Sequence, residues 1–322
     1  MTVRAVVLGA GGFLGSHLAR RLVALEWDVV GVVRDPDAPH VRTRLGGALG
    51  DMRLVVGDAT DHDLVRGLVA DVDAVFPFAG HSGAARSMAE PFHDLVANAG
   101  GQLAVLEAVR VHNPMARIVF PGSRLQYGRA RYLPVDELHP QDPTSLYGLH
   151  KLVGDQYYRL YHDLYGLRTA CLRISNPYGP HQDRPDRAFG VVGTFLSIAS
   201  ANGSIPVYGG GAQTRDYVYV GDVVDVCVLA ATHTAAVGRT YNVGGPAPVT
   251  VREMAEAVVS TVGAGRVVDA PWPDMEGKVE TGDYTGDLRR AATELGWAPT
   301  VGLTEGLAAT WDALAPTLSS AG

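Results

Sequence analysis

The sequence predicts an α/β fold, in which a doubly wound parallel sheet is followed by a smaller C-terminal α+β region. Two observations carry this prediction. Short apolar runs alternate with stretches of helical periodicity over the first 120 residues, and this alternation is typical of right-handed βαβ units. The first apolar run leads directly into the glycine-rich segment 9–15, which suits the turn between the first strand and the first helix of such a sheet.

The predicted strands are short and rich in β-branched residues, as expected for strands that are buried on both faces. They cover residues 3–8, 28–33, 52–56, 74–78, 118–120 and 169–174. Helical periodicity covers residues 14–25, 61–69, 95–112 and 146–164. From Asn176 onward the segments shorten and glycine and proline become frequent, with loops expected at 180–189 and 207–213. We therefore expect a sheet domain over residues 1–175, to which residues 214–245 return, and a second domain formed mainly by residues 176–322.

The composition limits the classes of protein to which the chain could belong. Its 322 residues, 47% hydrophobic and 19% charged, suit a globular enzyme of one or two domains and argue against disorder. A net charge of −7 without a basic block argues against a nucleic-acid partner. No apolar run approaches the roughly 18 residues of a membrane span, and no charged-then-apolar leader precedes the first strand. Cys171 and Cys227 lack metal or redox spacing, so we expect buried thiols, no metal and a cytoplasmic location.

The segment Gly9-Ala10-Gly11-Gly12-Phe13-Leu14-Gly15 has the spacing of a dinucleotide-binding loop. Glycines at its first, fourth and seventh positions permit a tight turn, close approach of the backbone to a pyrophosphate, and close helix packing. The start of the following helix, around Phe13 and Leu14, would supply N–H donors and a partial positive charge. A bare glycine pattern also fits an ordinary turn, but its place after the first strand predicts a Rossmann-type cofactor domain.

Two further positions bear on the cofactor. Arg34 ends the second strand, where an acidic residue would hold a ribose 2′-hydroxyl and an arginine can accommodate a 2′-phosphate. This favours NADP over NAD, although the adjacent Asp35 could take the acidic role if the register differs by one residue. Asp58, followed by Ala59 after the third strand, suits a hydrogen bond to an adenine amino group. The alternative for Asp58 is a helix N-cap.

Tyr147 and Lys151 are four residues apart on a predicted helix and therefore share one face of it. A phenol has a pKa near ~10, and an adjacent ammonium lowers that pKa by favouring the phenolate. A tyrosine tuned in this way can move a proton to or from a substrate hydroxyl. The same spacing is common on amphipathic helices without any catalytic role. The nucleotide loop is what turns the pair into a prediction of proton transfer coupled to hydride transfer.

Several other motifs follow in a fixed order along the chain. They are Phe78-Ala79-Gly80, Asn98, Ser123 four residues before Tyr127-Gly128, Asn176-Pro177-Tyr178-Gly179-Pro180, the run 213–222, Leu295-Gly296-Trp297 and Glu305-Gly306-Leu307. With the glycine loop and the Tyr147–Lys151 pair, the chain resembles the extended short-chain dehydrogenases/reductases over nearly its whole length. Within them it is most similar to NAD(P)-dependent nucleotide-sugar epimerases and dehydratases, and closest to the sugar-nucleotide 4-epimerases.

The resemblance implies a role for each matching residue. Tyr147 would be the acid/base, Lys151 would lower its pKa and hold ribose hydroxyls, and Ser123 would orient the sugar hydroxyl. The cofactor would also contact Phe78, Ala79 and Asn98. The resemblance further implies a nucleotide-sugar substrate, for which the predicted contacts are Asn176, Val207, Tyr208 and, at the diphosphate, Arg215.

The residues after Ser123 depart from the pattern of the dehydratases, which carry an Asp-Glu pair there. Arg124 and Leu125 stand in those places, so 4,6-dehydration is disfavoured, and the absence of a glutamate at Leu125 also disfavours decarboxylation. Two chemistries remain: a 4-epimerase that works through a transient 4-keto sugar, and an NADPH-dependent 4-ketoreductase. A non-catalytic NADP-binding regulator is disfavoured, because such proteins usually lose the tyrosine or the lysine.

A second departure concerns the substrate. Many relatives have an arginine for the diphosphate where this chain has Glu280, and Lys278 could substitute for it. His81, Ser82 and Arg124 could reach the sugar, and a uronic acid would suit Arg124; ordinary loop polarity is the alternative for all three.

The resemblance also implies a homodimer formed through a four-helix bundle of the helices at 95–111 and 146–164. The apolar and aromatic side chains expected at its surface are Tyr157, Tyr158, Leu160, Tyr161 and Leu164. Packing of these side chains within one subunit is the alternative.

Overall fold

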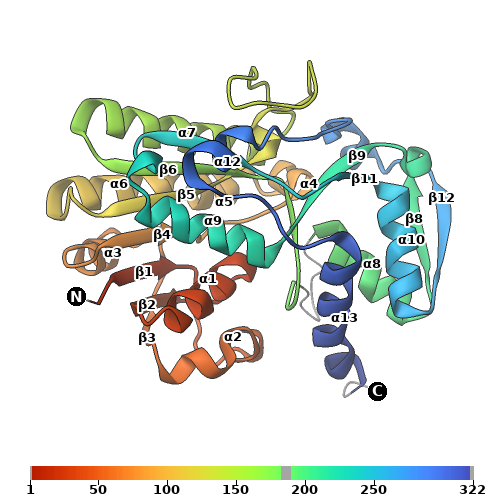
Figure 1. The fold of residues 1–322 in the computed structure, drawn as a ribbon, viewed down its shortest axis with the longest axis horizontal. Helices are drawn as coiled ribbons and strands as arrows, with labels where there is room; N and C mark the ends of the chain where they lie inside the picture. Colours follow the sequence, from red (N-terminus) through yellow and green to blue (C-terminus); the bar gives the residue numbers. More distant parts are fainter. Residues whose placement is uncertain (1, 183–189, 320–322) are drawn as a thin grey trace.

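The computed structural model describes residues 2–182 and 190–319. Its main sheet has seven parallel strands in the order β10-β6-β5-β4-β1-β2-β3 (Figure 1). The strands are β1 (Arg4–Leu8), β2 (Asp28–Val33), β3 (Arg53–Val56), β4 (Ala74–Pro77), β5 (Arg117–Ser123), β6 (Arg168–Ile174) and β10 (Arg239–Val243). The predicted doubly wound sheet is therefore confirmed. The strand order reverses between β1 and β4, which places a crevice at their carboxyl ends.

The strands are apolar on both faces because helices cover both faces of the sheet. Along β1, Ala5 and Val7 belong to one apolar core, together with α1 (Phe13–Ala24) and α9 (Val220–Thr232). Val6 and Leu8 belong to the other core, with α3 (His62–Val69), α6 (Gly101–His112) and α7 (Leu146–Tyr165). This alternation explains why the strands read as continuous apolar runs rather than as alternating patterns.

Helix α7 is more deeply buried than the sequence predicted. Tyr158 is fully buried, and its hydroxyl donates to Gln102 Oε1 at 2.9 Å. Tyr161 is also buried, and its hydroxyl donates to Glu107 Oε1. The prediction that these two tyrosines are exposed was therefore wrong, because α7 packs against both β5 and α6. Leu160 and Leu164 of the same helix are exposed.

A second group of elements lies beyond the carboxyl ends of the strands. A three-stranded sheet contains β7 (Asn176–Tyr178), β9 (Thr214–Tyr219) and β11 (Pro248–Thr250), and β8 (Ser204–Tyr208) pairs with β12 (Arg266–Ala270). Helices α8 (Gly190–Ser200), α10 (Val251–Val262) and α13 (Leu303–Ser319) pack with them around a separate apolar core. Val207 and Tyr208 end strand β8, so the loop predicted at 207–213 starts two residues later. Residues 183–189 of the other predicted loop lie outside the described residues.

Short helices make up the remainder. They are α2 (Pro39–Leu45), η1 (Gly46–Gly50), α4 (Ala84–Ala89), α5 (Pro91–Leu95), the π turn η2 (Val96–Gly100), η3 (Arg124–Gln126), η4 (Gly209–Gly211), η5 (Thr234–Ala236), α11 (Asp274–Val279) and α12 (Arg289–Leu295). The helix predicted at 95–112 is thus interrupted by a π turn before α6. Within the described part of the chain, no helix has the length and apolar character needed to cross a membrane.

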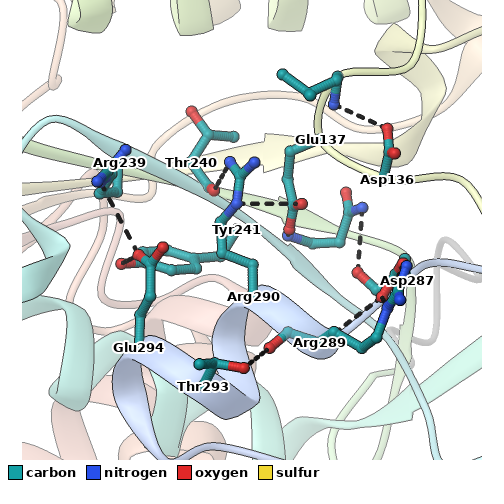
Figure 2. Close-up of polar contacts among 12 residues, drawn as sticks. Asp136, Glu137, Arg239, Thr240, Tyr241, Asp287, Arg289, Arg290, Thr293 and Glu294 are labelled. Carbon is teal, nitrogen blue, oxygen red and sulfur yellow. Dashed lines mark hydrogen bonds and ion pairs between the residues drawn. The ribbon is translucent and has the colours of Figure 1, made fainter.

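Helix α12 fastens the late part of the chain to the edge of the main sheet (Figure 2). Arg290 donates to the carbonyl of Thr240 at 3.2 Å and pairs with Glu137 at 3.4 Å. On the same helix, Glu294 accepts a 2.9 Å hydrogen bond from the hydroxyl of Tyr241. Both Thr240 and Tyr241 belong to β10, so these contacts cover the edge strand, which would otherwise be open to pairing with another chain.

Candidate active site

A cavity of about 1530 Å³ follows the carboxyl ends of the strands from β2 to β6. Most of the predicted site residues line it: Gly9, Gly12, Phe13, Leu14, Gly15, Arg34, Asp58, Ala59, Phe78, Ala79, His81, Ser82, Asn98, Ser123, Arg124, Tyr147, Lys151 and Asn176. Three predicted substrate contacts are not among the described residues that line it. Val207 is buried in the separate apolar core beside α8, α10 and α13. The ring centroid of Tyr208 lies 5.4 Å from that of Trp272. Arg215 donates to neighbouring protein groups, among them the carbonyl of Gly282.

The glycine loop fits a pyrophosphate because its backbone is closely packed and has no side chains in the way. Gly9 has a φ of +83°, and a Cβ there would lie 2.7 Å from the amide nitrogen of Ala79. A Cβ on Gly15 would lie 2.2 Å from the carbonyl oxygen of Gly9. Gly12 is the N-cap of α1 and provides no side-chain cap. Among the described residues, the first N–H groups of α1 therefore have neither an intrahelical nor a capping partner, as an anion site requires.

The loops after β2 and β3 form the far end of the cavity. Arg34 is exposed there and lies close enough to Asp58 for its charge to lower the pKa of that carboxyl group. The larger cause of this lowered pKa is a hydrogen bond from the backbone N–H of Thr60, at 2.9 Å. The N-cap of α3 is Asp61. Asp58 therefore holds a turn rather than capping the helix.

Asn98 lies in the π turn η2, a type of distortion that often occurs at functional sites. Its Nδ2 group donates to the carbonyl of His81 at 3.0 Å and so fixes the loop after β4. Its Oδ1 atom is buried and has no hydrogen-bond partner among the described residues. A Cβ on Gly80 would lie 2.6 Å from this oxygen. An acceptor left open beside the cavity fits the predicted contact with a cofactor.

The structure brings Ser123 and Tyr147 together. Ser123 ends β5, and its hydroxyl caps η3 by accepting from the N–H of Leu125 at 3.2 Å. Tyr147 lies in the first turn of α7, next to Gly148. A Cβ on Gly148 would lie 2.5 Å from the carbonyl oxygen of Leu125, so glycine lets the helix approach the turn. Ser123 then lies close enough to Tyr147 to lower the pKa of the tyrosine hydroxyl.

The electrostatics of the pair differ from those the spacing predicted. Burial raises the pKa of Tyr147 to about 12, although the hydrogen bond with Ser123 opposes this rise. Lys151 donates to the carbonyl of Pro121 at 2.8 Å, and its Nζ lies 5.9 Å from the centroid of the Tyr147 ring. Burial also lowers the pKa of Lys151 to about 8. The pKa of Tyr147 is thus raised rather than lowered as predicted, because desolvation outweighs the opposing effect, which comes from Ser123 and not from the lysine charge.

A buried polar group behind Tyr147 and Lys151 was missed by the sequence analysis. The carboxylate of Asp94, on α5, is in contact with His150 Nδ1 at 2.6 Å and accepts from Asn98 Nδ2 at 3.0 Å. Its charge raises the pKa of Lys151, against the larger effect of burial. Asp94 and His150 are 56 residues apart. No spacing rule connects them, and only the packing of α5 on α7 brings them together.

The two arginines predicted to bind substrate have different surroundings. Arg124 lines the cavity, where its Nε donates to Asn176 Oδ1 at 2.8 Å and its Nη1 donates to Thr281 Oγ1 at 3.0 Å. Arg215 is also buried, but it pairs with Glu280 and donates to the carbonyl of Gly282 at 2.6 Å. Glu280, which stands where many relatives have an arginine, therefore neutralises the charge of Arg215. Its predicted contact with a diphosphate stays a prediction.

Comparisons with known proteins agree with this geometry. The profile of the "NAD dependent epimerase/dehydratase family" matches residues 5–244. A putative UDP-glucose 4-epimerase of Methanocaldococcus jannaschii is 34% identical over 94% of this chain and 95% of that protein. A dTDP-glucose 4,6-dehydratase of Streptomyces niveus is 29% identical over 96% of this chain and 91% of that protein. The structure of UDP-glucose 4-epimerase from Thermotoga maritima with UDP-glucose has a TM-score of 0.88 and 27% identity, and the match covers 98% of this chain and 100% of that one. The chain therefore belongs to the NAD dependent epimerase/dehydratase family, among the nucleotide-sugar enzymes of the extended short-chain dehydrogenase/reductase superfamily.

Proposed function

We propose that the protein is a nucleotide-sugar 4-epimerase that acts on a UDP-sugar through a transient 4-keto intermediate. The observation that carries the proposal is the meeting of Ser123, Tyr147 and Lys151 with the glycine loop in one cavity. The acidic residues among its described lining are Asp35, Asp58 and Glu90, which come from the cofactor end or the end of α4. Dehydration is disfavoured because no described carboxylate lines the cavity beside Ser123.

The proposed mechanism assigns one task to each residue. The backbone of Gly9, Gly12 and Gly15 would hold the pyrophosphate of NAD, which would supply reversible hydride transfer at C4 of the sugar. Ser123 holds the C4 hydroxyl, and Tyr147 takes its proton as the carbonyl forms and gives it back after the ring has turned its other face. The Lys151 ammonium stabilises the phenolate during this exchange. The raised pKa of Tyr147 makes its phenolate a stronger base for taking the proton and makes the phenol a weaker acid when the proton is returned.

A second candidate is an NADPH-dependent 4-ketoreductase, which would use the same catalytic residues. The observation that favours it is the exposed Arg34 at the end of β2, where it lines the cavity and is suited to a 2′-phosphate. A ketoreductase would release its cofactor after each turnover, whereas an epimerase would retain it.

We also infer a homodimer and a cytoplasmic location. The dimer is supported by exposed apolar side chains on the helices predicted to form its bundle, among them Leu95 at the end of α5, Val111 on α6 and Leu164 on α7. Cys171 and Cys227 are free, buried thiols, which suits a reducing compartment. We also propose a cofactor domain over 1–175 and a substrate domain over 176–322, because the sequence pattern changes from Asn176 onward. Strand β10 of the later segment pairs with β6 of the cofactor domain.

The proposed function is tested with UDP-, dTDP-, CDP- and GDP-sugars incubated with the purified protein without added cofactor. Interconversion of two C4 epimers supports the epimerase, and turnover only of a 4-keto sugar with added NADPH contradicts it. Tyr147→Phe should lower kcat by about 100-fold or more while retaining cofactor binding. The matched control is Tyr165→Phe, which changes an exposed tyrosine on the same helix. Activity of Tyr147→Phe equal to that of the control would refute the role of Tyr147.

A further inference from the structure

Arg124 is a buried cation that has no acidic partner in the part of the chain that the structure describes. Arg124 is 6% exposed, and no carboxylate of the described residues forms an ion pair with it. Glu280 and Asp216 lie near enough for a charge interaction with Arg124, but both carboxylates have other partners. The carboxylate of Asp216 accepts hydrogen bonds from the backbone N–H groups of Gly245 and Gly286, and Glu280 pairs with Arg215. Burying a charge without a counter-charge is costly, which makes this arginine a candidate receptor for an anion.

The guanidinium group is held in place for such a contact. The side chains of Asn176 and Thr281 accept from Nε and Nη1, and the Tyr284 ring centroid lies 5.2 Å from Cζ. These neutral partners fix its position without neutralising its charge. Among the described residues none accepts a hydrogen bond from Nη2, although Arg124 lines the catalytic cavity. Burial lowers the pKa of Arg124 to about 10, so it remains charged at neutral pH.

The place of Arg124 next to Ser123 identifies which anion it would meet. Under the proposed function, Ser123 and Tyr147 hold C4 of the sugar. In a pyranose ring, C1, which carries the diphosphate, lies across the ring from C4, whereas the substituent of C5 is adjacent to C4. An anion beside the reacting hydroxyl is therefore the C6 group of the sugar, and a planar carboxylate matches the donor geometry of a guanidinium.

We propose that Arg124 is the specificity-determining residue for a carboxylate on C6, and that the preferred substrate is a nucleotide-linked uronic acid. This inference rests on the proposed function, because it uses the placement of C4 at Ser123 and Tyr147. The carboxylate would take the open Nη2 side of the guanidinium, while Asn176 and Thr281 keep the arginine in position. The cost of its buried charge would then be recovered only when the acidic sugar is bound.

The test compares UDP-glucuronate with UDP-glucose, which differ only at C6. For the wild-type protein we expect kcat/KM to favour the uronate. For Arg124→Met we expect the ratio of the two kcat/KM values to fall by about 10- to 100-fold, the usual range for a hydrogen bond to a charged group. The control is Arg86→Met, which removes another cation from the lining of the same cavity and should leave the ratio unchanged. Equal losses on both substrates in Arg124→Met would overturn the proposal, because they would place Arg124 at the shared diphosphate.

Binding measured by calorimetry, in the presence of NAD, separates this inference from the proposed function. Tighter binding of UDP-glucuronate than of UDP-glucose, abolished in Arg124→Met, supports the carboxylate contact even if neither sugar is epimerised. Equal affinities in the wild-type protein would overturn it even if both are epimerised. Circular dichroism and NAD affinity of Arg124→Met and Arg124→Lys identify folded variants, and partial recovery of the preference in Arg124→Lys is expected because the charge is kept.

Discussion

The two ends of the catalytic cavity are built from different parts of the chain. The cofactor end is made mostly of backbone: a glycine loop, the start of α1 and the loop after β4. The substrate end contains the buried side chain of Arg124, which neutral groups hold, and near it lies Arg215, which is paired with Glu280 and is not among the described residues of the lining. Backbone sites tolerate little variation, whereas side-chain sites can change their ligand by changing one partner. We therefore expect the cofactor end to bind its cofactor as in other members of the family. We expect the substrate end to have a substrate specificity particular to this chain.

The largest effect is expected from Gly15→Ala at the cofactor end. The new Cβ would lie 2.2 Å from the Gly9 carbonyl oxygen, so the loop must move. A displacement of about 1 Å costs on the order of 100-fold in activity, and NAD affinity should fall similarly. Fluorescence titration with NADH measures this. Gly67→Ala is the control, because nothing lies within 4 Å of its Cβ. Unchanged NADH affinity in Gly15→Ala would contradict the assignment of the loop.

The pH dependence of kcat/KM tests the catalytic pair between the two ends. The pKa of Lys151 is lowered to about 8 by burial, so the ammonium is lost as the pH rises through that value. Without this charge the Tyr147 phenolate is less stable. Because the pKa of Tyr147 is about 12, kcat/KM should rise with pH as more phenolate forms, and this rise should stop above about pH 8, where the lysine charge is lost. Asp94→Asn removes a charge that raises the pKa of Lys151, so the plateau should begin at a lower pH. A kcat/KM that keeps rising about tenfold per pH unit well above pH 8 would show that Lys151 does not act through its charge.

Glu280→Gln tests whether the ion pair at the substrate end restrains Arg215. Removing the carboxylate would free the guanidinium to turn toward a diphosphate, and we expect the KM for UDP-sugars to fall about threefold to tenfold. Glu276→Gln, which changes an exposed glutamate on the neighbouring helix α11, serves as the control. A KM that is equal in both variants would mean that Arg215 has a purely structural role.

The smallest effect is expected at Arg34, where the cofactor end meets solvent. Arg34→Ala should weaken NADPH binding about twofold to threefold, because an exposed charge-assisted contact with the 2′-phosphate is lost, and should leave NADH binding nearly unchanged. Arg42→Ala is a suitable control, since Arg42 is an exposed arginine nearby that pairs with Asp37. Equal affinities for NADPH in both variants would remove the argument for NADP, and with it the main support for the ketoreductase.

The sequence predicted the parts of the molecule that depend on local patterns. The buried strands, the glycine loop and the Tyr147–Lys151 face of α7 follow from apolar runs and from spacing. Contacts between distant segments left no such pattern, as with Arg215 and Glu280, which are 65 residues apart. Burial was the other difficulty: Tyr158 was expected at the surface and Tyr147 with a lowered pKa, and both expectations failed because α7 is enclosed by β5 and α6. The short helices α2, α4 and α5 were not predicted, because each is too short to show a clear period in its apolar residues.

The most direct test of the central claim follows a deuterium atom at C4 of the nucleotide sugar. The substrate labelled at C4 is incubated with the protein without added cofactor, and the products are examined by NMR. An epimerase that removes and returns the same hydride should give the C4 epimer with the deuterium retained at C4. Replacement of the deuterium by hydrogen, or conversion only when NADPH is supplied, would contradict the account.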